Sequence, residues 1–133
     1  MATNGVSLGV QFSSDNGASW DSNAIYDTSM YQTNQNAFSS PASLSAATYG
    51  QITQSVSAAS GASVSGTLKL YRPSSSNYKI ATFQNGAFKS NNSFYNNDGS
   101  MLYRSNASIN AFRVFASSGN ITSGKVYFYG VSH

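Results

Sequence analysis

The chain has 133 residues, no cysteine and no glutamate, and only 8% of its residues are charged, with a formal net charge of +3. This length fits one domain with a hydrophobic core of its own. The lack of cysteine excludes disulfides, thiolate metal sites and cysteine nucleophiles. The seven Lys and Arg residues form no run, so the charge pattern argues against nucleic-acid binding.

Serine, asparagine, threonine and glycine fill the polar positions, a composition that we associate with extracellular and virion β-structures. No apolar run approaches the roughly 18 residues of a membrane-spanning helix. The first five residues lack the basic and apolar regions of a secretory signal. We therefore expect no membrane insertion. The absence of cysteine fits assembly in a reducing compartment.

The first predicted strand covers residues 6–12 and runs into an Asp15-Asn16-Gly17 turn. Its apolar side chains alternate with small or polar ones, which places four of them on one buried face: Val6, Leu8, Val10 and Phe12. Ile25 and Tyr26 begin or belong to a short second strand. Residues 27–50 show no clean periodicity, and within them Ser40 and Pro41 predict the start of a short helix over 40–47.

The middle of the chain predicts further short strands separated by turns. Residues 51–56 and 64–72 alternate, and residues 78–83 and 87–89 flank Asn85-Gly86, a favoured two-residue hairpin turn. A second turn is predicted at Asn97-Asp98-Gly99, before the apolar residues 101–104.

The end of the chain predicts a strand pair, with residues 109–115 and 125–131 joined by a glycine-containing turn over 117–124. In the second strand, Val126 and Phe128 share the face expected to meet the core, and Tyr127 and Tyr129 share the other. The total of about eight short strands at hairpin-like spacing predicts an all-β fold, an antiparallel sandwich or a barrel.

Two segments resemble the β-modules of tailed-bacteriophage virion proteins. They are VSLGVQFSSDNGASW at residues 6–20 and INAFRVF followed by SGNITSGKVYFYGV at the end of the chain. The resemblance implies a single jelly-roll-like β-sandwich with a structural or attachment role, and it supplies no catalytic or ligand-binding residue. Those modules have more strand before the SLGVQF position, so this domain is either shorter or completed by a neighbouring subunit at its N-terminal edge.

Three residues are candidates for an oligomer interface: Tyr127, Tyr129 and Arg113. An exposed Tyr127–Tyr129 face could stack on sugars or pack on a partner, but a fully apolar strand favours burial on both faces. Arg113 lies in an apolar strand and is expected to meet an acid, a carbonyl or an interface. Four aromatic residues near polar loops are candidates for glycan contact: Trp20, Tyr26, Tyr31 and Tyr95.

The sequence predicts no cofactor, no metal site and no catalytic site. Asp15, Asn16 and Asp21 could offer oxygen ligands to Ca²⁺, but their spacing is that of an ordinary turn. The four aspartates could pair as in a glycosidase, yet they lie mostly in turn-like contexts. His133 is the only histidine and the last residue, so a Ser-His-Asp triad lacks a positioned base.

These observations together predict a non-enzymatic virion protein, assembled in the host cytoplasm, that associates with itself, as a trimer, and with other virion proteins. A tail or fibre position is favoured over capsid decoration, with a contribution to attachment at a host-surface glycan. The alternative is a carbohydrate-binding module without catalytic activity.

Overall fold

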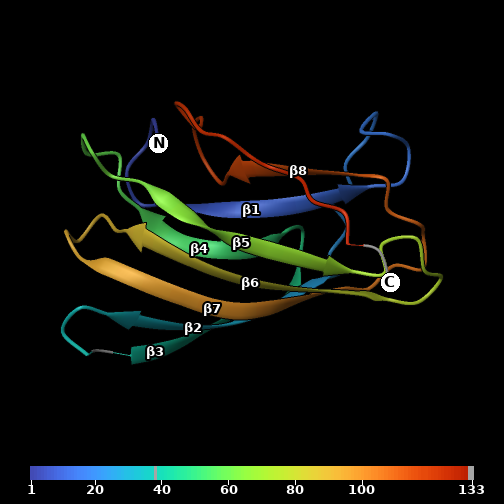
Figure 1. Cartoon of the computed structure of the whole chain (residues 1–133), viewed down its shortest axis with the longest axis horizontal. Helices are drawn as coiled ribbons and strands as arrows, with labels where there is room; N and C mark the ends of the chain where they lie inside the picture. Colours follow the sequence, from blue (N-terminus) through green and yellow to red (C-terminus); the bar gives the residue numbers. More distant parts are fainter. Residues whose placement is uncertain (38, 132–133) are drawn as a thin grey trace.

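Two antiparallel sheets pack face to face in the computed structural model, which describes residues 1–37 and 39–131 (Figure 1). The smaller sheet has the order β4-β1-β8, with strands β4 (Gly50–Val56), β1 (Val6–Ser13) and β8 (Ala111–Ala116). The larger sheet has the order β3-β2-β7-β6-β5, with strands β3 (Ser39–Ala47), β2 (Tyr26–Asn34), β7 (Phe94–Tyr103), β6 (Lys79–Phe88) and β5 (Val64–Tyr71). The predicted antiparallel β-sandwich of about eight strands is confirmed, and the nested pairing of β1 with β8 and of β2 with β7 is jelly-roll-like.

Strand β1 forms where its alternation predicts it, and its four apolar side chains face the core with exposed fractions of 8% or less. The opposite face of β1 is also covered, which alternation alone does not predict. A side chain at Gly9 would meet the rings of Tyr49 and Phe115, so only glycine allows these rings to lie on the strand. β1 is the central strand of its sheet, so the free sheet edges lie at β4 and β8, and at β3 and β5.

The helix predicted over residues 40–47 is wrong, because this segment is β3, paired with β2 along its whole length. Ala42 and Leu44 face inward while Ser43 and Ser45 face outward, a period of two rather than 3.6. Pro41 is tolerated because β3 is an edge strand. The short strand predicted at residues 25–26 extends to Asn34 as β2.

Both predicted Asn-Gly turns are wrong, because Asn85-Gly86 lies inside β6 and Asn97-Asp98-Gly99 lies inside β7. These glycines give room to aromatic rings rather than to a reversal of the chain. A Cβ atom at Gly86 would lie 2.9 Å from the ring of Phe94, and one at Gly99 would lie 2.6 Å from the ring of Phe83. The β6–β7 turn lies instead around Asn92, which has a positive φ of 60°.

One end of the sandwich interior is aromatic. The rings of Phe12, Tyr26 and Tyr103 pack with centroids 5.0 to 6.1 Å apart. The buried Tyr26 hydroxyl accepts the Phe12 N–H at 3.1 Å and donates to the Asp21 carbonyl at 2.9 Å, and the Tyr103 hydroxyl donates to the Asp21 carboxylate at 2.6 Å. Burial raises the pKa of the Tyr26 hydroxyl, and burial followed by the bond to Asp21 raises that of Tyr103 to about 12.

The other end of the interior is polar and is held by a chain of hydrogen bonds. The Lys89 ammonium donates to Gln32 at 2.8 Å, and the Gln32 amide donates to Asn97 at 2.8 Å. Asn97, which is fully buried, donates to Asn85 at 2.8 Å and to Thr53 at 3.3 Å. Lys89 also lies 4.0 Å from the centroid of the Tyr95 ring, and burial lowers the pKa of its ammonium group.

Candidate interaction surfaces

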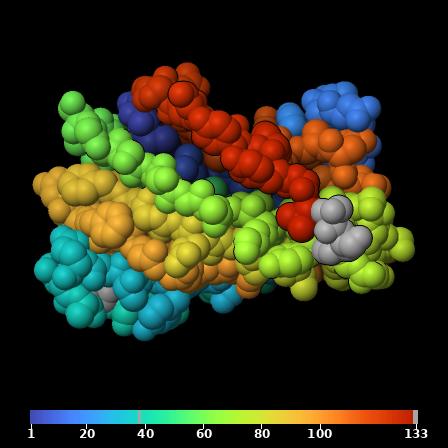
Figure 2. All heavy atoms as spheres, viewed as in Figure 1, coloured from blue at the N-terminus to red at the C-terminus, as the bar shows by residue number. Residues whose placement is uncertain are grey.

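Residues 117–131 leave β8 and run over the surface without regular secondary structure, so the strand predicted over residues 125–131 is wrong. Figure 2 shows this segment as a raised band that crosses the visible face of the molecule. Five large apolar side chains in it have exposed fractions of 61 to 84%: Val126, Tyr127, Phe128, Tyr129 and Val131. Val126 and Phe128 were expected to face the core and do not. Tyr127 and Tyr129 are the two candidate interface tyrosines, and both are open to a partner.

The first half of this segment is tied to the start of the chain. The Ala2 N–H donates to the Asn120 carbonyl at 2.9 Å, and the Ser117 N–H donates to the Ser7 carbonyl at 2.9 Å. In the second half, the ring of Phe128 packs on that of Phe112 of β8 with centroids 4.7 Å apart. The segment is therefore placed beside β8 but not built into the sheet.

Arg113, the third candidate interface residue, lies on the outer face of the smaller sheet. Its guanidinium donates two hydrogen bonds to Gln11 Oε1, at 3.0 and 2.6 Å, and lies 5.2 Å from the ring centroids of Trp20 and Phe115. The expected polar partner is thus an amide oxygen of the neighbouring strand. Because the Arg113 side chain remains exposed, this cationic and aromatic cluster is available to a partner surface.

The structure does not bring the four candidate glycan-contact residues together. Tyr26 is fully buried and Tyr95 is 7% exposed, so the burial of these two rings corrects their prediction as ligand contacts. Trp20 is half-buried beside Arg113, where it lines a hollow of about 280 Å³ with Asp21 and several serines. Tyr31 is 51% exposed on β2 of the other sheet.

The outer face of the larger sheet carries many small polar side chains that the sequence alone did not single out, together with the exposed Tyr31, Tyr71, Ile80 and Phe94. Every second residue of the strands points outward, as Ser29 and Tyr31 do in β2 and Ser100 does in β7. Toward the β5 edge this face has a shallow hollow of about 250 Å³ lined by Ser65, Gly66, Thr67, Gln84, Asn85, Gly86 and Asn96. The period-two serine pattern of residues 39–45 could have revealed the face.

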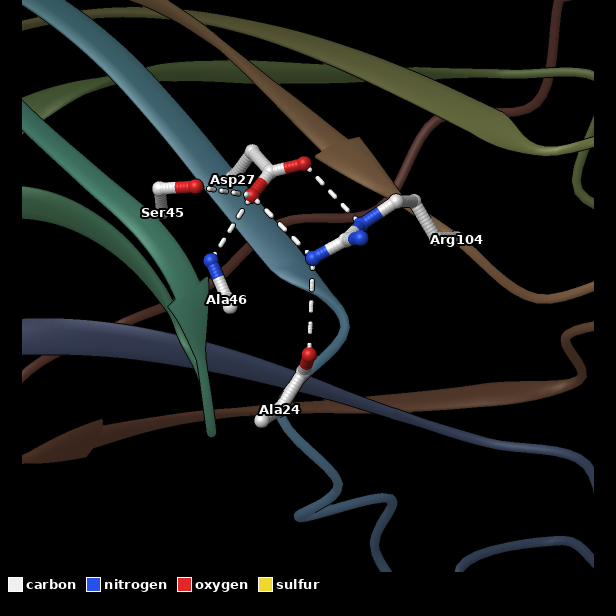
Figure 3. Close-up of polar contacts among 5 residues, drawn as sticks. All are labelled: Ala24, Asp27, Ser45, Ala46 and Arg104. Atoms are coloured by element: carbon white, nitrogen blue, oxygen red, sulfur yellow. Dashed lines mark hydrogen bonds and ion pairs between the residues drawn. The ribbon is translucent and has the colours of Figure 1, made fainter.

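The Asp27 carboxylate of β2 joins two residues of β3 to Arg104, the residue that follows β7 (Figure 3). It accepts the N–H of Ala46 at 2.8 Å and the hydroxyl of Ser45 at 3.2 Å. Arg104 forms an ion pair with Asp27, with 3.0 Å between Nε and Oδ2, but Nε itself makes no hydrogen bond within the described part of the chain. The Nη2 atom of Arg104 donates a hydrogen bond to Oδ1 at 3.3 Å. The Ala46 N–H and then the Arg104 charge hold the pKa of Asp27 below its usual value. This network stabilises the bulge in the β2–β3 ladder, where Ala46 has a φ of 51°.

The other candidate ligand and acid residues are also engaged locally. Asp15 accepts the hydroxyls of Ser13 at 2.6 Å and Ser19 at 2.5 Å, and these bonds hold its pKa at about 2. Asp21 receives the Tyr103 hydroxyl, and Asp98 receives the side-chain amide of Asn96. Over residues 1–37 and 39–131, no group of three or more His, Asp or Glu side chains is placed to hold a metal ion. His133 lies outside the described residues.

In comparisons with known proteins, the chain matches no protein-family model, no curated protein and no solved structure. Within the described part of the chain there is also no helix long and apolar enough to cross a membrane.

Proposed function

We propose that this chain is a non-enzymatic structural subunit of a tailed-phage particle, which associates with itself and docks on other virion proteins. One observation carries the proposal: the exposed apolar segment 126–131, on a protein whose remaining polar surface is mostly hydroxyl and amide. Contiguous exposed apolar side chains mark interaction sites on soluble proteins. The Arg113 cluster offers a second contact surface of the aromatic and arginine type that is enriched at interfaces.

The assignment to a virion rests on the resemblance of residues 6–20 and 109–131 to phage β-modules, and on the scarcity of charge. Within the particle we favour a tail or fibre position over capsid decoration, because attachment there accounts for an amide- and hydroxyl-rich surface. A trimer remains the expected assembly, with closed cyclic symmetry.

Sedimentation equilibrium of the purified chain tests the self-association. The expected result is a species that is a whole-number multiple of the 14.1 kDa chain. A mass of one chain at every concentration would contradict the proposal. Immunogold labelling of purified particles with an antibody to the chain then locates it on the tail, fibre or head, and particles without the chain contradict the virion assignment.

The second candidate is a carbohydrate-binding module, and the outer face of the larger sheet favours it. Tyr31 lies there between Pro41 of β3 and Asp98 of β7, and the hydroxyl side chains of the next outward row, Ser29, Ser43 and Ser100, can exchange hydrogen bonds with a sugar while the exposed ring stacks on it. Saturable binding of the isolated chain to a glycan array is the expected result for this function. Tyr31→Ala should abolish that binding, whereas Tyr78→Ala, also at an exposed tyrosine, serves as the control.

A further inference from the structure

The free edge of β8 is an unfilled strand position in the smaller sheet. β8 pairs with β1 on one side only, and the smaller sheet has three strands where the larger has five. β4, at the opposite edge, packs over the four strands β2, β3, β6 and β7, so β8 lies on the side of the sandwich where the larger sheet ends with β5.

Side chains that face the interior on this side are covered only in part. Phe112 and Val114 of β8 and Leu68 and Leu70 of β5 pack against the core but remain half-buried. A further strand beside β8 would extend the smaller sheet toward β5. It would also supply partners to the unpaired backbone groups of the β8 edge.

Residues 125–131 have the properties of that strand. The sequence KVYFYGV is rich in the β-branched and aromatic residues that strands prefer, and its length of seven residues suits the six of β8. In Figure 1 the segment passes between β8 and β5 in the view shown. It makes no ladder with β8 or with any other strand among the described residues, and five of its apolar side chains are 61 to 84% exposed, even though the Phe128 ring contacts that of Phe112.

We infer that residues 125–131 of one copy pair with the free edge of β8 of a second copy, so that each copy donates one strand and receives one. Donor and acceptor lie on the same chain, which makes the surface self-complementary and lets the exchange close into a symmetric assembly. The chain's own segment touches β8 through the contact of the Phe128 and Phe112 rings, but among the described residues it forms no backbone ladder with β8. This inference rests on the self-association in the proposed function and specifies how the copies join.

Disulfide trapping tests the exchange against a background without native cysteine. Arg113→Cys places a thiol on the exposed face of β8, and Tyr127→Cys places one on the donor segment. When the two single variants are mixed and oxidised, strand exchange predicts a mixed disulfide dimer of twice the chain mass. Tyr127→Cys mixed with Ser43→Cys, an exposed site on the distant β3 edge, should give no such dimer.

The same cysteines separate exchange between copies from closure within one copy. If the double variant Arg113→Cys/Tyr127→Cys forms only an intramolecular bond and the mixed single variants form none, the segment completes its own sheet and the inference is overturned. Lack of any disulfide in both experiments also overturns it.

A proline in the donor segment gives a second measurement on the whole chain. Phe128→Pro removes a backbone donor from the pairing strand, so the self-association constant should fall by roughly tenfold or more. Ser123→Pro, just before the segment, is the matched control and should leave the constant unchanged. An oligomer that Phe128→Pro leaves intact contradicts the exchange but not the self-association, whereas a monomeric wild-type chain contradicts the proposed self-association itself.

Discussion

The two ends of the sandwich interior are buried to a similar degree by the same strands, but they differ in chemistry. At one end, β1, β2 and β7 contribute Phe12, Tyr26 and Tyr103. At the other, β2 and β7 contribute Gln32 and Asn97 from the same inward faces. The aromatic end gains stability from removing apolar surface from water. The amide end is stable only because each polar group has a partner, since an unpaired buried amide costs free energy.

The two ends therefore stabilise the same sandwich by different interactions, apolar burial at one end and buried hydrogen bonds at the other. Asn97 and Tyr103 are six residues apart in β7, which is about 20 Å along a strand. Changes at the two ends should therefore add with little coupling, whereas changes within the amide end should couple strongly. Four predictions, from the largest effect to the smallest, test this separation.

The largest effect is expected at the aromatic end. Phe12 is 1% exposed, so Phe12→Ala should lower the free energy of unfolding by about 3–5 kcal/mol through lost apolar burial and a residual cavity. Urea denaturation measures the change. Thr67→Ala on the exposed face of β5 is the control, and a loss at Phe12 no larger than that of the control would contradict the role of this end.

At the amide end, Asn97→Ala should lower the free energy of unfolding by about 2–3 kcal/mol, because Gln32, Asn85 and Thr53 lose a buried partner. Ser100→Ala, on the exposed face of the same strand, should stay within about 0.5 kcal/mol of wild type. A double-mutant cycle with Gln32→Ala should show a coupling of at least about 0.5 kcal/mol. A double-mutant cycle of Asn97→Ala with Phe12→Ala should show a smaller coupling free energy. Strong coupling in that cycle would mean that the two ends are not independent.

Alkaline pH should weaken the aromatic end. The pKa of Tyr103 is raised from 10.0 to about 12, so its contribution is complete below pH 10 and is lost as the pH rises toward 12. Tyr103→Phe should cost about 0.5–1.5 kcal/mol at neutral pH through the lost bond to Asp21. It should also flatten the decline of stability between pH 10 and 12, measured by urea denaturation at each pH. Tyr31→Phe, at an exposed site, is the control and should decline as wild type does.

The smallest effect is expected at the surface network of Asp27. Its pKa is lowered from 3.8, so it contributes stability above that pH, and the contribution is lost as the pH falls through the lowered value. Asp27→Asn should lower the thermal midpoint slightly at pH 6, and the difference from wild type should narrow as the pH falls below 3.8. A difference that persists undiminished at low pH would assign the effect to the hydrogen bonds of the side chain and not to its charge.

The sequence predicts the aromatic end better than the amide end for a physical reason. Alternation of Val6, Leu8, Val10 and Phe12 identifies β1 and its buried face directly. Local pattern predicts Asn85 and Asn97 as turn residues, because asparagine close to glycine is typical of turns. In the fold the Asn97 amide donates to the side chains of Thr53 and Asn85, and the Asn85 amide donates to the Ile52 carbonyl, partners that a local pattern cannot reveal.

The same limit applies to the interaction surfaces. Local pattern assigns Tyr127 and Tyr129 to one face and Val126 and Phe128 to the core, but all four side chains are exposed. It wrongly makes residues 125–131 a strand of their own sheet, because strand propensity does not specify a pairing partner. Among the candidate contacts it also includes Tyr26, whose burial follows from packing between β1 and β7.

The position of β1 between β4 and β8 has a consequence for how the chain reaches its folded state. The side-chain hydrogen bond between Gln11 and Arg113 joins residues 102 positions apart. β1 therefore cannot complete its pairing until β8 is present. Closing such a long loop is entropically costly, and β-proteins dominated by distant contacts fold slowly, on the order of milliseconds to seconds. On the ribosome, the apolar face of Val10 and Phe12 therefore lacks its β8 neighbour until Ala116 has emerged. The smaller sheet can close only once β8 is available to pair with β1.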